Sequence, residues 1–253
     1  MSAILRRWPA VVAAALAAFA AVAVALAAHG WGPFGFERAA IDWSAHHRPP
    51  GARRVAIGVT VLGTGVAPYL VSLIAGLVLA RRRAAARPRR ARVALLLAPV
   101  LWLACGQLLR DALMHGFGRP RPPVARWATS AAGFSFPSGH SFTSAVCAGL
   151  LVVAVARRRP SWTPITSATA VLYAVAVGLS RVYLGVHWPL DVLGSWLLAA
   201  GWLAAGFALL GRVDPLGPVG PGSGDAAGTD GEGRAGDVKS EGAGESSGPR
   251  GGA

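Results

Sequence analysis

Six long apolar stretches, separated by short polar connectors, dominate the first 210 residues of the chain. A helix needs about 20 consecutive apolar residues to cross the hydrocarbon core of a bilayer, and each stretch is close to that length. We therefore predict an all-α, integral membrane protein built as a six-helix bundle. The expected spans are residues 8–28, 55–80, 93–113, 140–156, 164–184 and 190–210.

The first apolar stretch has a second interpretation, because Arg6 and Arg7 precede it as basic residues precede the apolar core of a secretory signal peptide. The stretch exceeds the roughly 7–15 apolar residues of such a core. Its length therefore favours a membrane span that the protein retains.

Residues 211–253 differ in composition from everything before them. They consist mainly of Gly, Pro, Ser, Asp and Glu, with almost no large apolar side chains. Such a segment buries too little surface to offset the entropy of folding, so we predict a disordered tail. The expected organisation is a six-span domain over 1–210, with its motif-bearing core at about 93–210, followed by this tail.

Charge is distributed unevenly along the chain and predicts its orientation. The formal net charge is +14, and the first 210 residues hold 21 arginines but only four carboxylates. A nucleic-acid-binding protein is often this basic. Here the arginines form blocks between apolar stretches, which instead indicates a membrane protein that contacts lipids and no nucleic acid.

The arginine blocks at 81–92 and 157–159 predict cytoplasmic connectors, because positive residues are enriched on the cytoplasmic side of membrane proteins. We therefore expect a multi-pass protein of the cell membrane with both termini in the cytoplasm. The connectors 29–54, 114–139 and 185–189 then face outward.

Polar residues that suit catalysis gather in these outward connectors and at the adjoining span ends. Ionisable groups at such positions are functional candidates by default. The second connector contains Gly-Arg-Pro-Arg-Pro at 118–122 and Phe-Pro-Ser-Gly-His at 136–140, and a third cluster runs from Ser180-Arg181 to His187 and Asp191.

The residue types in these clusters specify phosphoryl transfer without a metal ion or other cofactor. His187 and Asp191 are four residues apart, so on a helix the carboxylate holds one imidazole nitrogen and leaves the other free as a nucleophile. His140 is a candidate proton donor. The predicted helix N-termini near Ser138–His140 and near Pro189 are anion sites, which makes Ser138 and Gly139 candidate phosphate ligands. Guanidinium groups suited to phosphate come from Arg119, Arg121 and Arg181.

The three clusters resemble the type 2 phosphatidic acid phosphatase superfamily, which also includes vanadium haloperoxidases. The family pattern Pro-Ser-Gly-His matches fully at 137–140, and Ser-Arg-x5-His-x3-Asp matches fully at 180–191. The first family pattern, Lys-x6-Arg-Pro, ends at Arg121-Pro122 but has Met114 in place of its lysine. Arg110, one helical turn earlier, is our candidate substitute for that lysine.

The resemblance implies roles for individual residues. It makes His187 the site of a phosphohistidine intermediate, Asp191 the group that orients it, and His140 the acid and then the base. The phosphoryl oxygens are then bound by Ser138, Gly139, Arg121 and Arg181. Substrates of this membrane branch are lipid phosphates or isoprenoid diphosphates, which implies a phospholipid or polyprenyl diphosphate partner.

Two other functions stay open from the sequence. A phosphotransferase passes the phosphoryl group to an alcohol instead of water, and a non-catalytic lipid-binding protein uses the same fold without turnover. Met114 keeps the second alternative open. The sequence leaves the head group, the chain length and the oligomeric state undetermined.

Overall fold

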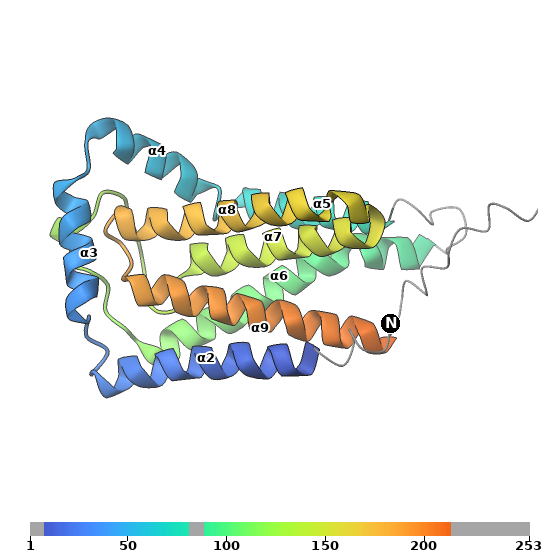
Figure 1. Ribbon diagram of the computed structural model, residues 1–253, viewed down its shortest axis with the longest axis horizontal. Helices are drawn as coiled ribbons and strands as arrows, with labels where there is room; N and C mark the ends of the chain where they lie inside the picture. The colour runs from blue at the N-terminus through green and yellow to red at the C-terminus, as the bar shows by residue number, and fades with distance from the viewer. Residues whose placement is uncertain (1–7, 81–88, 214–253) are drawn as a thin grey trace, which may run out of the picture. The chain divides into compact units, whose positions relative to one another are not determined.

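A computed structural model describes residues 8–80 and 89–213. Of the tail predicted over 211–253, residues 211–213 belong to the last helix, and the rest lies outside the described residues. Within the described ranges the chain forms helices joined by loops (Figure 1). The α-helices are α2 (Trp8–Ala28), α3 (Gly35–His46), α4 (Pro50–Val61), α5 (Val66–Ala80), α6 (Arg89–Phe117), α7 (Gly139–Arg158), α8 (Thr163–Tyr183) and α9 (Pro189–Val213). Two short 3₁₀ helices, η2 (Val124–Arg126) and η3 (Pro160–Trp162), lie in connectors.

The long helices lie side by side in one bundle, while α3 runs across one end of it (Figure 1). Five of them are long and apolar enough to cross a membrane, and the number rises to six if the bent pair α4–α5 is counted as one span. The prediction of an all-α, multi-pass membrane bundle is therefore confirmed.

The prediction of one continuous helix over residues 55–80 is wrong. The structure divides it into α4 and α5, which meet at an angle of 46° around the sequence Gly63-Thr64-Gly65. Gly65 has a φ of +61°, a conformation that glycine adopts without steric cost. At Gly63 a Cβ atom would lie 2.3 Å from the Val177 side chain, so a helix with a side chain there would not pack on α8.

The first outward connector also differs from the expectation of a loop over 29–54. It contains α3 and the first part of α4, because residues 35–46 carry apolar residues at helical spacing and begin after an extended Phe34. Phe36 and Trp43 of α3 are exposed, whereas Glu37 and Ile41 of the same helix are buried. An element that sequence reading treated as a loop thus covers the end of the bundle.

Helix α7 occupies the centre of the bundle and packs against α5, α6, α8 and α9. At its N-terminal end, Phe136 is fully buried and stacks on Phe19 of α2, with ring centroids 5.5 Å apart. Trp31 and Phe117 complete this aromatic cluster. The cluster anchors the turn that carries residues 137–140 and so determines where α7 begins.

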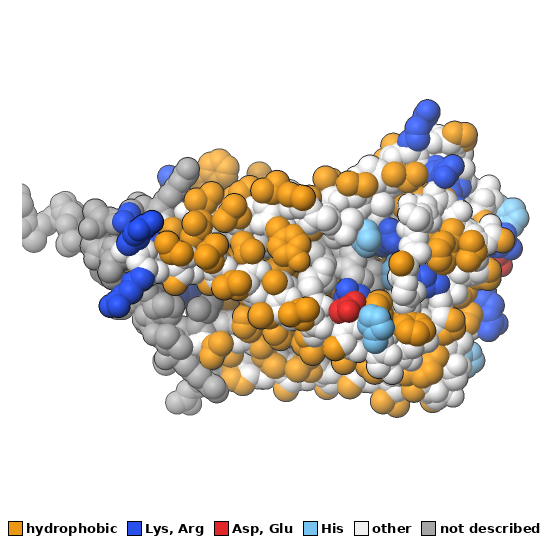
Figure 2. All heavy atoms as spheres, turned by 180° about the vertical axis from the view of Figure 1, so that it is seen from behind, with side chains coloured by type: hydrophobic (Ala, Val, Ile, Leu, Met, Phe, Trp, Pro, Cys, Tyr) orange, Lys and Arg blue, Asp and Glu red, His pale blue; other side chains and the backbone are white. Residues whose placement is uncertain are grey.

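The outer surface separates apolar from charged side chains, as a membrane protein requires. Figure 2 shows apolar side chains spread along the flanks of the bundle, with basic side chains gathered towards its two ends. The exposed apolar residues include Leu108 and Val171, which are 73% and 63% accessible. Lipid contact is the environment in which such exposure carries no penalty.

Candidate active site

The predicted site residues come together at one end of the bundle, although they come from separate stretches of the chain. The end of α6, the start of α7, the end of α8 and the start of α9 all reach this end (Figure 1). Two connectors supply the rest. Arg121 Nη1 lies 2.9 Å from His187 Nε2, and the Arg110 guanidinium lies against Gly139, the residue before His140.

His187 lies in the short connector between α8 and α9 and is 2% exposed. Its Nδ1 is 3.4 Å from Asp191 Oδ2, and its Nε2 is 2.9 Å from Arg121 Nη1. Arginine only donates hydrogen bonds, so Nε2 is the acceptor and the ring proton of the neutral imidazole lies on Nδ1, towards Asp191. The tautomer therefore directs the free lone pair of Nε2 towards the arginine.

The pKa of His187 is lowered from its usual value to about 4, mainly because burial disfavours the charged ring. Asp191 opposes this shift, and the positive charge of Arg121 adds to it. At neutral pH the ring is therefore uncharged and nucleophilic.

Asp191 is held by groups that all donate to it. Trp188 N–H donates to Oδ2 at 2.8 Å, Ser135 Oγ donates to the same oxygen, and Arg119 Nη1 contacts Oδ1 at 2.5 Å. Asp191 is also the third residue of α9, so its carboxylate closes the first turn of that helix through Trp188. The carboxylate that faces His187 is consequently fixed in position.

Arg121 lies in the connector between α6 and α7, directly beside His187. Besides His187, its guanidinium donates to the backbone oxygens of Ala132, Gly133 and Val186. Carbonyl contacts leave its positive charge uncompensated by a carboxylate at the position where a phosphoryl group would approach His187. The structure therefore places Arg121 directly beside His187, and its contact with phosphate stays a prediction.

Arg181 and Arg110 complete the positive surroundings of the site. Arg181 is 3% exposed, and its Nη1 donates to Thr60 Oγ1 on α4 at 3.0 Å. The Arg110 guanidinium lies against Gly139 at the start of α7: a Cβ atom there would be 3.3 Å from Arg110 Cζ. Arg110 Nη1 also contacts Met114 Sδ at 3.2 Å. The guanidinium thus reaches the turn that sequence reasoning assigned to phosphate.

Ser138 and His140 flank that glycine. Ser138 is the N-cap of α7, and its hydroxyl accepts from Ser141 N–H and from Ser141 Oγ. His140 occupies the second position of the helix. The backbone N–H groups of this first turn carry the positive end of the helix dipole.

Arg119 lies elsewhere than the sequence analysis expected. Its guanidinium is fully buried and contacts Asp191 and Glu37 Oε2, the latter at 2.7 Å. Its remaining donors approach the backbone oxygens of Trp31 and Gly32. Because its guanidinium is buried between two carboxylates, Arg119 holds Asp191 in place and is not positioned to contact phosphate.

Three groups around Asp191 were not among the predicted site residues. Ser135 lies just before the recognised Pro-Ser-Gly-His motif, and the Trp188 N–H belongs to the backbone. Glu37 lies about 80 residues earlier in the chain than the motifs. The only signal for it in the sequence is that carboxylates are scarce, since the first 210 residues contain four. In the described ranges, no group of three or more His, Cys, Asp or Glu side chains is arranged to hold a metal ion.

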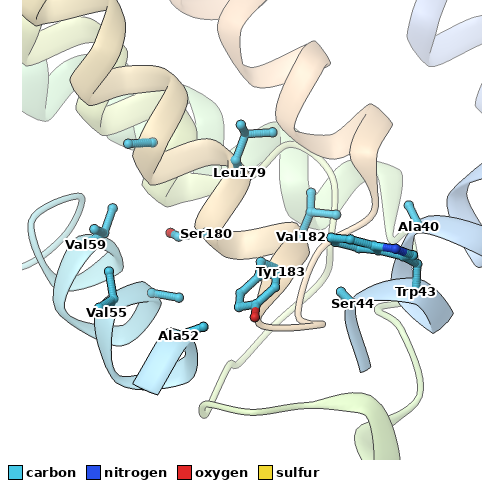
Figure 3. A pocket seen from close by; sticks show the side chains of 12 residues that line it. Ala40, Trp43, Ser44, Ala52, Val55, Val59, Leu179, Ser180, Val182 and Tyr183 are labelled. Atoms are coloured by element: carbon cyan, nitrogen blue, oxygen red, sulfur yellow. The ribbon is translucent and has the colours of Figure 1, made fainter. Parts of the chain in front are cut away.

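An apolar groove of about 760 Å³ opens beside the site, between α3, α4 and α8. In Figure 3, Val55 and Val59 of α4 face Leu179 and Tyr183 of α8, and Trp43 of α3 closes one end. Ser180, the neighbour of Arg181, also lines it. The apolar groove thus reaches the residue that precedes Arg181 in the chain.

The sequence of this chain is similar to those of known proteins. The model of the PAP2 superfamily matches residues 94–214. An undecaprenyl-diphosphatase of Sulfolobus acidocaldarius is 37% identical over 34% of this chain and 36% of its own length. A phosphatidylglycerophosphatase B of Bacillus subtilis is 31% identical over 60% of this chain and 71% of its own length.

A solved structure supports the same relationship. The crystal structure of a transmembrane PAP2-type phosphatidylglycerolphosphate phosphatase from Bacillus subtilis superimposes with a TM-score of 0.67. The match has 26% sequence identity and covers 82% of this chain and 98% of that one. Together with the match to the Bacillus relative over most of its length, this likeness shows that the chain belongs to the PAP2 superfamily.

Proposed function

We propose that this protein is a membrane phosphatase that hydrolyses a lipid phosphate or an isoprenoid diphosphate through a phosphohistidine at His187, at the outer face of the membrane. The observation that carries the proposal is the geometry of His187. Its Nδ1 faces a fixed carboxylate, and its Nε2 lone pair faces Arg121 at 2.9 Å. The imidazole of His187 is thus a nucleophile with an orienting carboxylate on one side and a cation for the incoming phosphoryl group on the other.

The first step transfers the phosphoryl group to the protein. His187 Nε2 attacks phosphorus, and the bond from phosphorus to the bridging oxygen breaks. His140, which takes up a proton when the anionic phosphoryl group lies beside it, gives that proton to the bridging oxygen. The leaving group is the lipid alcohol, or the lipid monophosphate when the substrate is a diphosphate. The phosphorylated ring is cationic, and Asp191 stabilises it across the 3.4 Å separation from Nδ1.

The second step releases inorganic phosphate. His140, now neutral, takes a proton from a water molecule, whose oxygen attacks phosphorus while the bond to Nε2 breaks. Both steps place negative charge on the phosphoryl oxygens. Arg121, Arg181, Arg110 and the first N–H groups of α7 are the donors that we assign to those oxygens.

The groove supports a lipid as the substrate. It is lined by apolar side chains, lies beside Ser180-Arg181 and has room for part of a hydrocarbon chain. The relatives named above act on phosphatidylglycerophosphate or undecaprenyl diphosphate by their names, which is consistent with a long apolar chain attached to phosphate.

Phosphate release by purified protein tests the proposal, with phosphatidate, phosphatidylglycerol phosphate and undecaprenyl diphosphate as substrates in the presence of EDTA. We expect His187→Ala to abolish turnover together with the acid-labile phosphoenzyme. We expect His140→Ala to still form phosphoenzyme from a substrate with a good leaving group, because such a group needs no proton. Asp191→Asn should lie between these two variants.

His115→Ala is the matched control, because His115 lies on α6 close to the site but its side chain is 60% exposed. It should keep wild-type activity. Substantial turnover in His187→Ala would refute the phosphohistidine mechanism. Transfer to an added alcohol in preference to water would identify a phosphotransferase, and lipid binding without phosphate release would identify a non-catalytic protein.

A further inference from the structure

We infer that Glu37 is a positioning residue which, through Arg119, maintains the negative charge that Asp191 presents to His187. The inference rests on the proposed chemistry at His187. Glu37 lies on α3, outside the residues that the family model matches, and contacts neither His187 nor the arginines assigned to phosphate. Its influence on the reaction therefore passes through its partners.

Glu37 is fully buried and accepts three hydrogen bonds. Oε2 accepts from Arg119 Nη2 at 2.7 Å and from Phe34 N–H at 3.0 Å, and Oε1 accepts from Leu190 N–H at 3.0 Å. Every partner is a donor, so the carboxylate satisfies all three, whereas an amide would direct its own N–H at one of them. The contacts therefore require a carboxylate at this position.

The Leu190 contact ties Glu37 directly to the helix that carries the proposed catalytic carboxylate. Leu190 is the second residue of α9, and Asp191 is the third. A carboxylate at the first N–H groups of a helix is stabilised by the helix dipole. Glu37 and Asp191 therefore hold the same helix end from two sides, with the Arg119 guanidinium between them.

The charges in this buried group decide how strongly Asp191 acts on His187. Arg119 by itself would neutralise Asp191, and their pair would offer no net charge to a cationic phosphohistidine. With Glu37 the three side chains carry a net charge of −1, and all three are inaccessible to solvent. Because solvent does not screen a buried charge, that net −1 stabilises the cationic ring. Without Glu37 the same positions would sum to zero.

Charge restoration tests this role, because a purely structural role predicts a different pattern. Glu37→Gln removes one negative charge, and the double variant Glu37→Gln/Arg119→Gln removes a charge of each sign and returns the group to −1. We expect Glu37→Gln to lower kcat roughly tenfold or more and to change KM by less than about twofold. Effects of this size are typical when a residue that holds a functional side chain in place is replaced. The double variant should recover a large part of that loss.

Orthovanadate supplies a second readout that is independent of the lipid, because it adopts the five-coordinate geometry of phosphoryl transfer. Its affinity, measured by the shift in melting temperature, should fall in Glu37→Gln and recover in the double variant. Wild-type protein could bind vanadate in a His187-dependent way and still release no phosphate from any lipid substrate. That result would refute the proposed lipid phosphatase function. The vanadate affinities of the Glu37 variants would still test the role of Glu37.

Asp42→Asn is the matched control, since Asp42 is the other carboxylate of α3 and pairs with Arg126 at 2.8 Å on the surface. It should match wild type in both readouts. Should Glu37→Gln fail to fold, Glu37→Asp, which keeps the charge, should fold and retain vanadate affinity within about threefold of wild type. The inference is overturned if Glu37→Gln behaves like Asp42→Asn, if the double variant is no better than Glu37→Gln, or if Glu37→Asp loses vanadate binding.

Discussion

At the scale of single residues, the buried position of His187 suits its imidazole to the proposed role of nucleophile beside Arg121 and Arg181. Burial holds its pKa at about 4, so the ring stays neutral without a catalytic base to deprotonate it. The nearby carboxylate limits this shift, and the nearby arginine extends it. Burial and Arg121 therefore keep the free ring neutral, and Asp191 is the group that we expect to stabilise the ring in the proposed phosphohistidine.

This pKa predicts the acid side of the pH profile. Because the nucleophile must be unprotonated, kcat/KM falls as the pH drops below the pKa of His187 in the free protein. A histidine with its ordinary pKa would lose activity below about pH 6.5, whereas we expect His187 to support activity down to about pH 4. The measurement is kcat/KM from pH 4 to 8, corrected for the titration of the substrate phosphate, whose second pKa is about 6. A corrected acid limb at pH 6.5 would contradict the buried neutral ring.

Arg110 is predicted to replace the lysine that the family pattern places at Met114. Its guanidinium lies against Gly139, where the phosphoryl oxygens are expected. We expect Arg110→Ala to lower kcat/KM about 100-fold, the size of effect seen when one transition-state donor is removed. Phosphate release under subsaturating substrate measures it. Arg92→Ala is the control, because Arg92 is an exposed arginine at the opposite end of the same helix.

Met114→Lys provides the complementary test of this substitution. In the Arg110→Ala background the new ammonium group should restore part of the lost activity. In the parent protein it should give no gain, because Met114 is 7% exposed and contacts Arg110, so the two positive charges would repel. If Arg110→Ala loses no activity, or if Met114→Lys does not restore it, Arg110 is not the substitute for the family's lysine.

At the scale of elements, the sequence predicts most of the helices and the convergence of the motifs. The first span was predicted with the bounds 8–28 that α2 has, because its apolar run ends sharply on both sides. The sequence did not predict the break between α4 and α5, because a straight helix and a bent one have the same apolar composition. The role of Arg119 was also missed. Its partner Glu37 is distant in the chain, and local spacing contains no information on such a pair.

The turn that begins α7 depends on a close contact between two elements, and this contact yields a prediction. A Cβ atom on Gly194 of α9 would lie 2.4 Å from the ring of Phe136, which is fully buried next to Pro137. We expect Gly194→Ala to push this ring and the following motif out of place. The cost of such overpacking is typically about 1–3 kcal/mol of stability, and activity should fall as well.

Thermal unfolding in detergent and phosphate release measure the effect of Gly194→Ala. Gly58→Ala on α4 is the matched control, because a Cβ atom there meets nothing within 4 Å and alanine favours a helix interior. Phe136→Leu in the Gly194→Ala background should regain stability by making room. Wild-type stability in Gly194→Ala would show that the aromatic cluster does not set the position of the turn.

At the scale of the whole molecule, the described arginines separate into two groups with different surroundings. Those at the start of α6 and the end of α7 lie at the end of the bundle opposite the site (Figure 1). At the site end, Arg48 Nη1 donates to the Arg126 carbonyl and Arg53 Nε donates to the Ala128 carbonyl. These two arginines therefore hold the connector that carries Arg121, which accounts for their presence on a side where topology alone would not place them.

This asymmetry predicts the orientation of the protein in the membrane. Arginines near span ends favour the cytoplasm, and the sequence between 81 and 92 alone contains seven of them, so the opposite end with the site should face outward. A reporter enzyme that is active only outside the cytoplasm should work when inserted near Trp127 and fail when inserted near Pro88 or fused after residue 213. Expression of each fusion, checked by immunoblot, separates an inactive reporter from an absent one. The reverse pattern would place the site in the cytoplasm and would require a substrate from the inner leaflet, because the groove beside Arg181 would then open to that side.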